Sequence, residues 1–170
     1  RGHSFTILGD LSQGIHAYKG VHAWEEMQSL FAPEHTSYHS LTRSYRSTME
    51  IIDFANGILS SGVGSPLLAV PVFRSGNPVR LISYRENTES EDRMKDLSAA
   101  LRLLSSREYR TVAVLTRSLL EANEFHSKLA EQFSDINLID GSMTEYKGGL
   151  SVLPLYLSKG LEFDAVIVAD

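Results

Sequence analysis

The stretch "LTRSYRSTMEII" (41–52) sets two arginines and a tyrosine between a short apolar run and the start of a helical pattern. Tight turns favour Gly, Pro or Asn, and this stretch contains none of them. If Ser47 caps the helix, Tyr45 and Arg46 stand just before a helix N-terminus, which attracts anions. Arg46 would then bind a phosphate with a forked pair of hydrogen bonds, and Tyr45 would offer a flat face to a base. The alternative is that Arg46 pairs with a surface carboxylate and Tyr45 fills core.

Other polar residues also follow apolar runs. They are Asp10 and Gln13 after "FTILG" (5–9), Arg117 after "TVAVLT" (111–116), and Lys159, Gly160 and Glu162 after "LSVLPL" (150–155). Ligands of open parallel sheets bind beyond the carboxyl ends of the strands. We therefore expect these groups, together with Tyr45 and Arg46, to lie along one edge of a sheet. The alternatives are that Asp10 caps a turn, and that Lys159 and Glu162 form a surface ion pair.

The elements that would position these residues alternate along the chain. Continuous apolar runs indicate strands buried on both faces, and hence a parallel sheet; they cover 5–9, 79–84, 111–116, 150–155 and 165–169. Apolar residues at 94, 97, 101 and 104, and at 122, 125, 129 and 133, predict two helices. Residues 60–78 hold many of the Gly and Pro residues and predict a long loop. The expected fold is α/β, with a doubly wound and mainly parallel sheet.

Three capping boxes predict where helices begin. They pair Ser47 with Glu50, Thr88 with Glu91, and Ser118 with Glu121. The first of these helices would carry Ile51, Ile52, Ala55, Ile58 and Leu59.

Composition excludes several classes of protein. The 170 residues contain no cysteine, which excludes disulfides and thiolate metal sites and suits a reducing compartment, so we expect a cytoplasmic protein. No apolar run is long enough to cross a membrane, and no signal-peptide pattern is present. His35 and His39 are four residues apart, but Pro33 disfavours a helix there and no third ligand is in sight, so no metal site is predicted. The chain opens without Met and stops after a strand-like run, and we expect a fragment of something longer.

Three stretches carry a family resemblance. In order along the chain, "ILGDLSQGIHAYKG" (7–20), "LTRSYRSTMEII" (41–52) and "LYLSKGLEFDAVIV" (155–168) resemble motifs III, IV and V of superfamily 1 helicases of the UvrD/Rep type. The resemblance implies a DNA helicase that hydrolyses ATP with Mg²⁺. It also implies a RecA-like fold, in which residues 1–20 end the first motor domain and 21–170 form most of the second.

The resemblance also implies roles at the nucleotide. Gln13 would sense the γ-phosphate and position the attacking water, and Asp10 would hold that loop. Tyr45 would stack on adenine, and Arg46 would act as an arginine finger. Glu162 would contact the ribose side, with Lys159 and Gly160 shaping the loop.

Single-stranded DNA would be contacted by Tyr18, with His16 and Lys19, since aromatic stacking tolerates any base. Arg117 would contact the nucleic-acid backbone or a neighbouring carboxylate. His16 and Tyr18 stand where UvrD-type enzymes usually have tyrosine and tryptophan.

Departures from the family pattern favour an alternative function. Tyr156 stands where most members carry histidine, and Pro154 precedes it by two residues. This variant resembles the HelD branch, whose members use ATP to displace RNA polymerase. A third alternative is a degenerate domain that binds a partner without catalysis. No G-x-x-x-x-G-K-[ST] loop is present, so we expect the phosphate cradle and the Mg²⁺ ligands in an upstream RecA-like domain. This chain alone is expected to be inactive.

Overall fold

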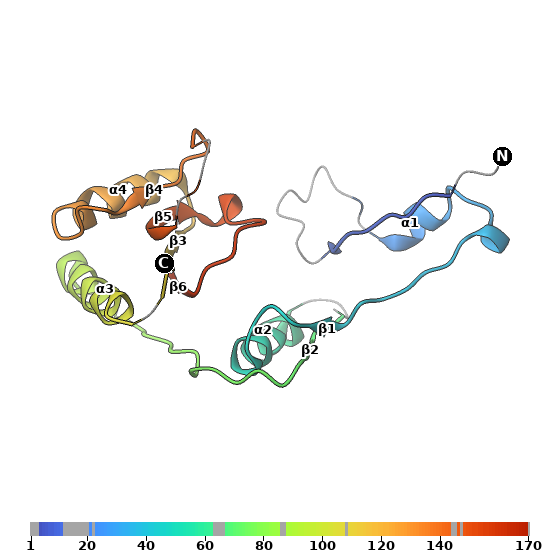
Figure 1. The fold of residues 1–170 in the computed structure, drawn as a ribbon, viewed down its shortest axis with the longest axis horizontal. Coiled ribbons are helices and arrows are strands. Elements are labelled where there is room, and N and C mark those ends of the chain that lie inside the picture. The colour runs from blue at the N-terminus through green and yellow to red at the C-terminus, as the bar shows by residue number, and fades with distance from the viewer. Residues whose placement is uncertain are drawn as a thin grey trace. The chain divides into compact units, whose positions relative to one another are not determined.

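The computed structural model describes residues 4–11, 21, 23–62, 67–85, 88–107, 109–143, 146 and 148–169. The chain divides into two compact units, Arg1–Ile82 and Ser83–Asp170. Figure 1 shows the helices and strands of both units. The expected domain boundary after residue 20 stays a prediction, because it falls at the end of a segment outside the described residues.

The second unit is built on a four-stranded parallel sheet. Its strands lie in the order β4-β5-β3-β6, and they span Asn137–Leu138 (β4), Gly149–Pro154 (β5), Thr111–Thr116 (β3) and Ala165–Val168 (β6). The central strand β3 is buried from Val112 to Thr116. Because both of its faces are covered, its apolar residues run without alternation. The three apolar runs predicted as strands in this unit are confirmed.

Two helices of this unit, α3 (Ser90–Ser105) and α4 (Leu119–Ala130), pack on one face of the sheet. Their apolar residues recur every three to four positions, which gathers these residues into one stripe. The buried cluster that joins the helices to the sheet consists of Leu97, Leu101, Val112, Val114, Ala122, Leu129, Ile136 and Val152. Both predicted helices are confirmed.

The opposite face of the sheet carries a second buried cluster. Side chains alternate along a strand, so Ala113 and Leu115 of β3 point away from the helices and pack with Ile139 and Leu153. Turns and a 3-10 helix supply the side chains that cover them, which are Tyr146, Leu157, Leu161 and Phe163. The α/β class and the parallel sheet predicted from the sequence are confirmed. The arrangement is consistent with a RecA-like doubly wound domain.

The first unit centres on a small strand–helix–strand element. In chain order the unit contains α1 (Trp24–Gln28), the 3-10 helix η2 (Pro33–His35), β1 (Arg43–Ser44), α2 (Met49–Ser61) and β2 (Val70–Pro71). β1 and β2 pair in parallel, with Arg43 opposite Val70. The predicted helix is confirmed as α2, which buries Ile52 and leaves Ile51 and Ile58 exposed.

Two predicted strands are wrong. Residues 5–9 and 79–84 have no regular secondary structure. Their apolar composition matches that of β3, but a strand also needs a hydrogen-bonded neighbour, and none of the described strands pairs with either segment. Phe5 and Leu81 are accordingly exposed. The predicted loop at 60–78 is also partly wrong, because α2 ends at Ser61 and β2 lies within that range.

The predicted helix starts have mixed outcomes. Ser118 is the N-cap of α4, and its hydroxyl accepts a hydrogen bond from the Glu121 amide at 3.2 Å, as predicted. The N-cap of α3 is Glu89 rather than Thr88, and the N-cap of α2 is Thr48 rather than Ser47. Neither Glu89 nor Thr48 makes a side-chain cap hydrogen bond. At α2 the Glu50 carboxylate, which a capping box would direct to the N-cap amide, is instead bound by Ser75 and Gly76.

Candidate functional site

The structure divides the predicted site residues between its two units. Asp10, Tyr45 and Arg46 lie in the first unit, and Arg117, Lys159, Gly160 and Glu162 lie in the second. Gln13, His16, Tyr18 and Lys19 lie outside the described residues. Asp10 is exposed at the end of residues 4–10, where the expected strand is absent. Tyr45 follows a strand of the two-stranded sheet and Arg117 a strand of the four-stranded sheet, so their meeting at one shared edge stays a prediction.

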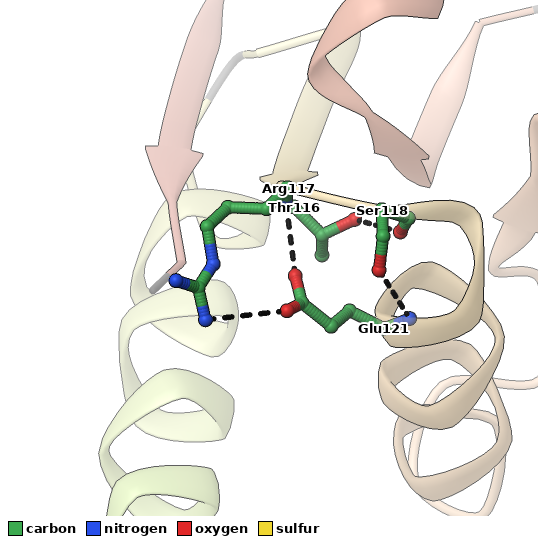
Figure 2. Close-up of polar contacts among 4 residues, drawn as sticks. All are labelled: Thr116, Arg117, Ser118 and Glu121. Atoms are coloured by element: carbon green, nitrogen blue, oxygen red, sulfur yellow. Dashed lines mark hydrogen bonds and ion pairs between the residues drawn. The ribbon is translucent and has the colours of Figure 1, made fainter.

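The carboxyl end of β3 carries a compact polar network, which Figure 2 shows. Thr116 is buried, and its hydroxyl donates a hydrogen bond to the Ser118 carbonyl at 2.9 Å. The Glu121 carboxylate accepts a 2.9 Å hydrogen bond from the Arg117 amide and forms a 3.3 Å ion pair with the Arg117 guanidinium. One carboxylate therefore holds both the backbone and the side chain of Arg117.

Arg117 stays accessible despite this ion pair. Its side chain is 73% exposed. An exposed ion pair of this kind contributes little to stability, so its main effect here is to orient the guanidinium. Of the two contacts expected for Arg117, a neighbouring carboxylate is present as Glu121. Contact with nucleic acid stays a prediction.

The segment after β5 presents Lys159 and Glu162 from a fixed turn. The 3-10 helix η3 (Leu155–Leu157) ends the strand, and the Leu161 amide donates a 3.0 Å hydrogen bond to the Ser158 carbonyl. Leu157 and Leu161 pack into the second cluster, which leaves the polar side chains between and beside them at the surface. Gly160 has a φ of 86°, which side-chain-bearing residues rarely adopt. Its glycine is therefore explained by the backbone of the turn.

Tyr45 and Arg46 form an exposed loop between β1 and α2. The Tyr45 side chain is 68% exposed, so the alternative that it fills core is wrong in this unit. Arg46 is also exposed. The Met49 amide at the start of α2 donates to the Arg74 carbonyl at 2.9 Å, so one N–H expected to attract an anion is already bound. An anion at this loop would depend on the Arg46 guanidinium more than on that helix end.

Glu50 lies in the first turn of α2, just after this loop, and two hydrogen bonds hold its carboxylate in place. Its two oxygens accept hydrogen bonds from the Ser75 hydroxyl at 2.6 Å and the Gly76 amide at 2.8 Å. The Ser75 hydrogen bond, followed by backbone amides, lowers the pKa of Glu50 from 4.5 to about 2. Sequence reasoning assigned Glu50 only to a capping box, since nothing local identifies partners 25 and 26 residues away.

Asp164 is a second residue that sequence reasoning missed. It ends the "KGLEFD" stretch, and its carboxylate accepts hydrogen bonds from the amides of Arg110 at 2.7 Å and Thr111 at 2.9 Å. These amides, Arg110 first, lower the pKa of Asp164. The contact lies at the amino ends of β3 and β6, so it belongs to the scaffold beneath the candidate site.

No group of three or more His, Asp or Glu side chains among the described residues is arranged to hold a metal ion. Likewise, none of the helices in the described ranges has the length and apolar character needed to span a membrane.

Neither a protein-family model nor a curated protein matches this sequence. The chemistry must therefore be argued from the side chains. The first unit offers an exposed aromatic ring beside an exposed guanidinium, a combination suited to a base and a phosphate. The second offers an oriented, exposed arginine at the carboxyl end of a parallel strand.

Proposed function

We propose that this chain is the second RecA-like motor domain of an ATP-dependent DNA helicase of the UvrD/Rep type. The observation that carries the proposal is the adjacent pair Tyr45–Arg46, exposed directly after a parallel strand and two residues ahead of the N-cap of a helix. The parallel α/β sheet of the second unit supports it further. The order of the three motif-like stretches adds the sequence argument.

Tyr45 and Arg46 fit the two ends of a nucleotide. The exposed Tyr45 ring would stack on adenine, and the neighbouring guanidinium would reach the γ-phosphate. As the γ-phosphoryl group leaves, Arg46 would counter the developing negative charge, which is the role of an arginine finger. Gln13 would orient the attacking water and Asp10 would support its loop. Glu162, with Lys159 and Gly160, would contact the ribose side.

Mg²⁺ would neutralise charge on the phosphates when bound. We expect the residues that hold it to lie in an upstream RecA-like domain. ATP would bind between that domain and this one. Closing and reopening the cleft would then move the two domains along a strand. The proposed motor would work in the cytoplasm, which the absence of cysteine suits.

Arg117 would contact the backbone of single-stranded DNA. Its guanidinium is oriented by Glu121 and remains exposed, so a phosphate can replace or share the ion pair. Tyr18, His16 and Lys19 would supply the stacking and further charge that hold a strand without sequence preference.

A HelD-like ATPase that displaces RNA polymerase is the second candidate. Pro154 and Tyr156 favour it, as the variant residues of the third motif-like stretch. In the structure Pro154 is the buried last residue of β5, and Tyr156 lies on η3 with its side chain exposed. Tyr156 is therefore available to a partner.

Two assays on the full-length protein test these functions. The first measures ATP-dependent unwinding of a duplex with a single-stranded tail, and the second measures capture of RNA polymerase. Unwinding without polymerase binding supports the helicase and contradicts the HelD-like alternative. Polymerase binding and ATP-dependent displacement without unwinding would have the opposite meaning.

A further inference from the structure

Four residues, together with the Met49 amide, join the start of α2 to the segment that follows β2. Glu50 binds the Ser75 hydroxyl at 2.6 Å and the Gly76 amide at 2.8 Å, one carboxylate oxygen to each. The Arg74 carbonyl accepts from the Met49 amide at 2.9 Å. We refer to Glu50, Arg74, Ser75 and Gly76 as the Glu50 clamp. Its bonds connect consecutive residues of one segment to consecutive residues of the other, which fixes their relative position.

The clamp reaches the Tyr45–Arg46 loop through Arg74. The Arg74 guanidinium donates a hydrogen bond to the Arg46 carbonyl at 3.4 Å. Arg74 thus holds the chain before α2 with its side chain and the first residue of α2 with its carbonyl. A shift of the 74–76 segment would be transmitted to the peptide that carries Arg46.

Gly76 gives separate evidence of a close fit. A Cβ built on Gly76 would lie 2.5 Å from the Thr48 Cγ2 atom and 3.0 Å from the Thr48 Cβ atom. A contact of 2.5 Å is shorter than real Cβ atoms show, so with any other residue at position 76 either the Thr48 side chain or the segment would have to shift. Glycine here permits the approach that lets Glu50 reach the Gly76 amide.

A second anchor holds the other end of the same segment. The Asn56 side chain donates to the Ala69 carbonyl at 2.8 Å and accepts from the Ala69 amide at 3.1 Å. Asn56 and Glu50 therefore fasten residues 69–76 to α2 at two places, with β2 between them. Since β2 pairs with β1, the loop from Tyr45 onward begins at a fixed strand and ends at the clamp.

We propose that Glu50 is a positioning residue that holds Arg46 in place for phosphoryl transfer, acting through the segment of Arg74, Ser75 and Gly76. This inference rests on the proposed role of Arg46. Glu50 is half-buried, and its two hydrogen bonds tie residues 75 and 76 to the first turn of α2. Catalysis by a positioned group is sensitive to displacements of about 1 Å, which can cost about 10²-fold in rate.

The test measures ATP hydrolysis by the full-length protein with single-stranded DNA present. Glu50→Ala removes both carboxylate hydrogen bonds, and Asp53→Ala removes one carboxylate from an exposed site on the same helix as the matched control. We expect Glu50→Ala to lower kcat by about 10²-fold, with a much smaller change in KM for ATP, and Asp53→Ala to match the parent protein. Glu50→Gln keeps one acceptor oxygen and should lie between them.

A double-mutant cycle separates positioning from general damage. Combined with Arg46→Ala, the Glu50→Ala substitution should cause no further loss, because the group that it positions is gone. Equal loss in both backgrounds would overturn the proposal, and so would a Glu50→Ala rate equal to that of Asp53→Ala. If Arg46→Ala itself leaves hydrolysis unchanged, the proposed role of Arg46 fails first, and the clamp loses its function with it.

Two further variants keep the test independent of the Glu50 side chain. Ser75→Ala removes one partner of the carboxylate without adding atoms, and Gly76→Ala crowds the Thr48 side chain. Each substitution should lower kcat when it is made alone, and neither should lower kcat further when it is combined with Arg46→Ala. If Gly76→Ala fails to fold, Ser75→Ala still decides the outcome. Normal hydrolysis by folded Ser75→Ala and Glu50→Ala proteins contradicts the proposal.

Discussion

Thr111 and Asp164, 53 residues apart, are joined by reciprocal hydrogen bonds. The Asp164 carboxylate accepts from the Thr111 amide at 2.9 Å, and the Asp164 amide donates to the Thr111 hydroxyl at 2.8 Å. The contact fixes the start of β6 against the start of β3. It therefore sets the register of the two strands whose far ends lead toward the candidate site.

Replacing Asp164 should give a pH-dependent loss of stability. In the folded protein the pKa of Asp164 lies below its ordinary value of 3.8, chiefly because the Arg110 amide donates a hydrogen bond to the carboxylate. A lowered pKa stabilises the fold above pH 3.8, and this contribution disappears as the pH falls through the lowered value. Asp164→Asn should therefore reduce the melting temperature at pH 7, and the difference should shrink below pH 3.8.

Thermal unfolding across pH 2–7 measures this effect. Asp135→Asn is the matched control, since within the described part of the chain its carboxylate accepts a single exposed hydrogen bond, from the adjacent Ser134 at 3.3 Å. A constant difference between Asp164→Asn and the parent at every pH would contradict the linkage.

The helix–sheet core should respond strongly to a loss of volume. Leu101 is fully buried, whereas Leu103, two residues along α3, is 49% exposed. Leu101→Ala should cost about 2–5 kcal/mol, and Leu103→Ala about 0.5 kcal/mol or less. Urea unfolding of both variants measures these free energies. Similar costs at the two positions would mean that α3 does not pack as described.

Removing the N-cap of α4 should destabilise the second unit moderately. The Ser118 hydroxyl accepts a hydrogen bond from the Glu121 amide, which has no backbone partner in the first turn of the helix. Ser118→Ala should cost about 1 kcal/mol, and Ser118→Asp should recover most of that loss because Asp also caps well. Chemical denaturation of both variants tests this, and equal stability of Ser118→Ala and the parent would contradict the cap.

Arg117 should bind single-stranded DNA without regard to sequence. If it contacts one phosphate, Arg117→Ala should weaken binding evenly across sequences and reduce the slope of log K against log[salt] by about 0.7. Arg107→Ala removes an exposed arginine just beyond α3 and is the control. Titrations of the full-length protein at several salt concentrations measure both slopes. An unchanged slope for Arg117→Ala would contradict the contact with DNA and leave the ion pair with Glu121 as the role of this arginine.

The sequence predicted the parts of the fold that depend on local pattern. The strand at 111–116 and the helix that carries Leu97 and Leu101 follow from continuous burial and from helical spacing. Residues 5–9 have the same apolar character, yet they form no strand, because pairing depends on a partner that composition does not reveal.

The candidate site likewise contains contacts that local sequence spacing predicts and contacts that it does not. The Arg117–Glu121 ion pair joins residues four apart in the sequence at the start of α4, so the contact with a carboxylate was open to prediction from spacing. The bonds from Glu50 to Ser75 and Gly76 cross the whole of α2 and β2, and the Thr111–Asp164 contact crosses most of the second unit. Contacts between residues so far apart in the sequence depend on the tertiary structure, and no local sequence pattern predicts them.

The most direct test of the account is the rate of DNA-stimulated ATP hydrolysis by full-length Arg46→Ala, measured together with nucleotide binding. Arg80→Ala, which removes an exposed arginine of the same unit, is the control. If Arg46 is an arginine finger, hydrolysis should fall by about 10³–10⁵-fold while nucleotide still binds, and Arg80→Ala should behave like the parent. Near-normal hydrolysis by Arg46→Ala would contradict the account, because it would make this arginine a structural residue of the loop.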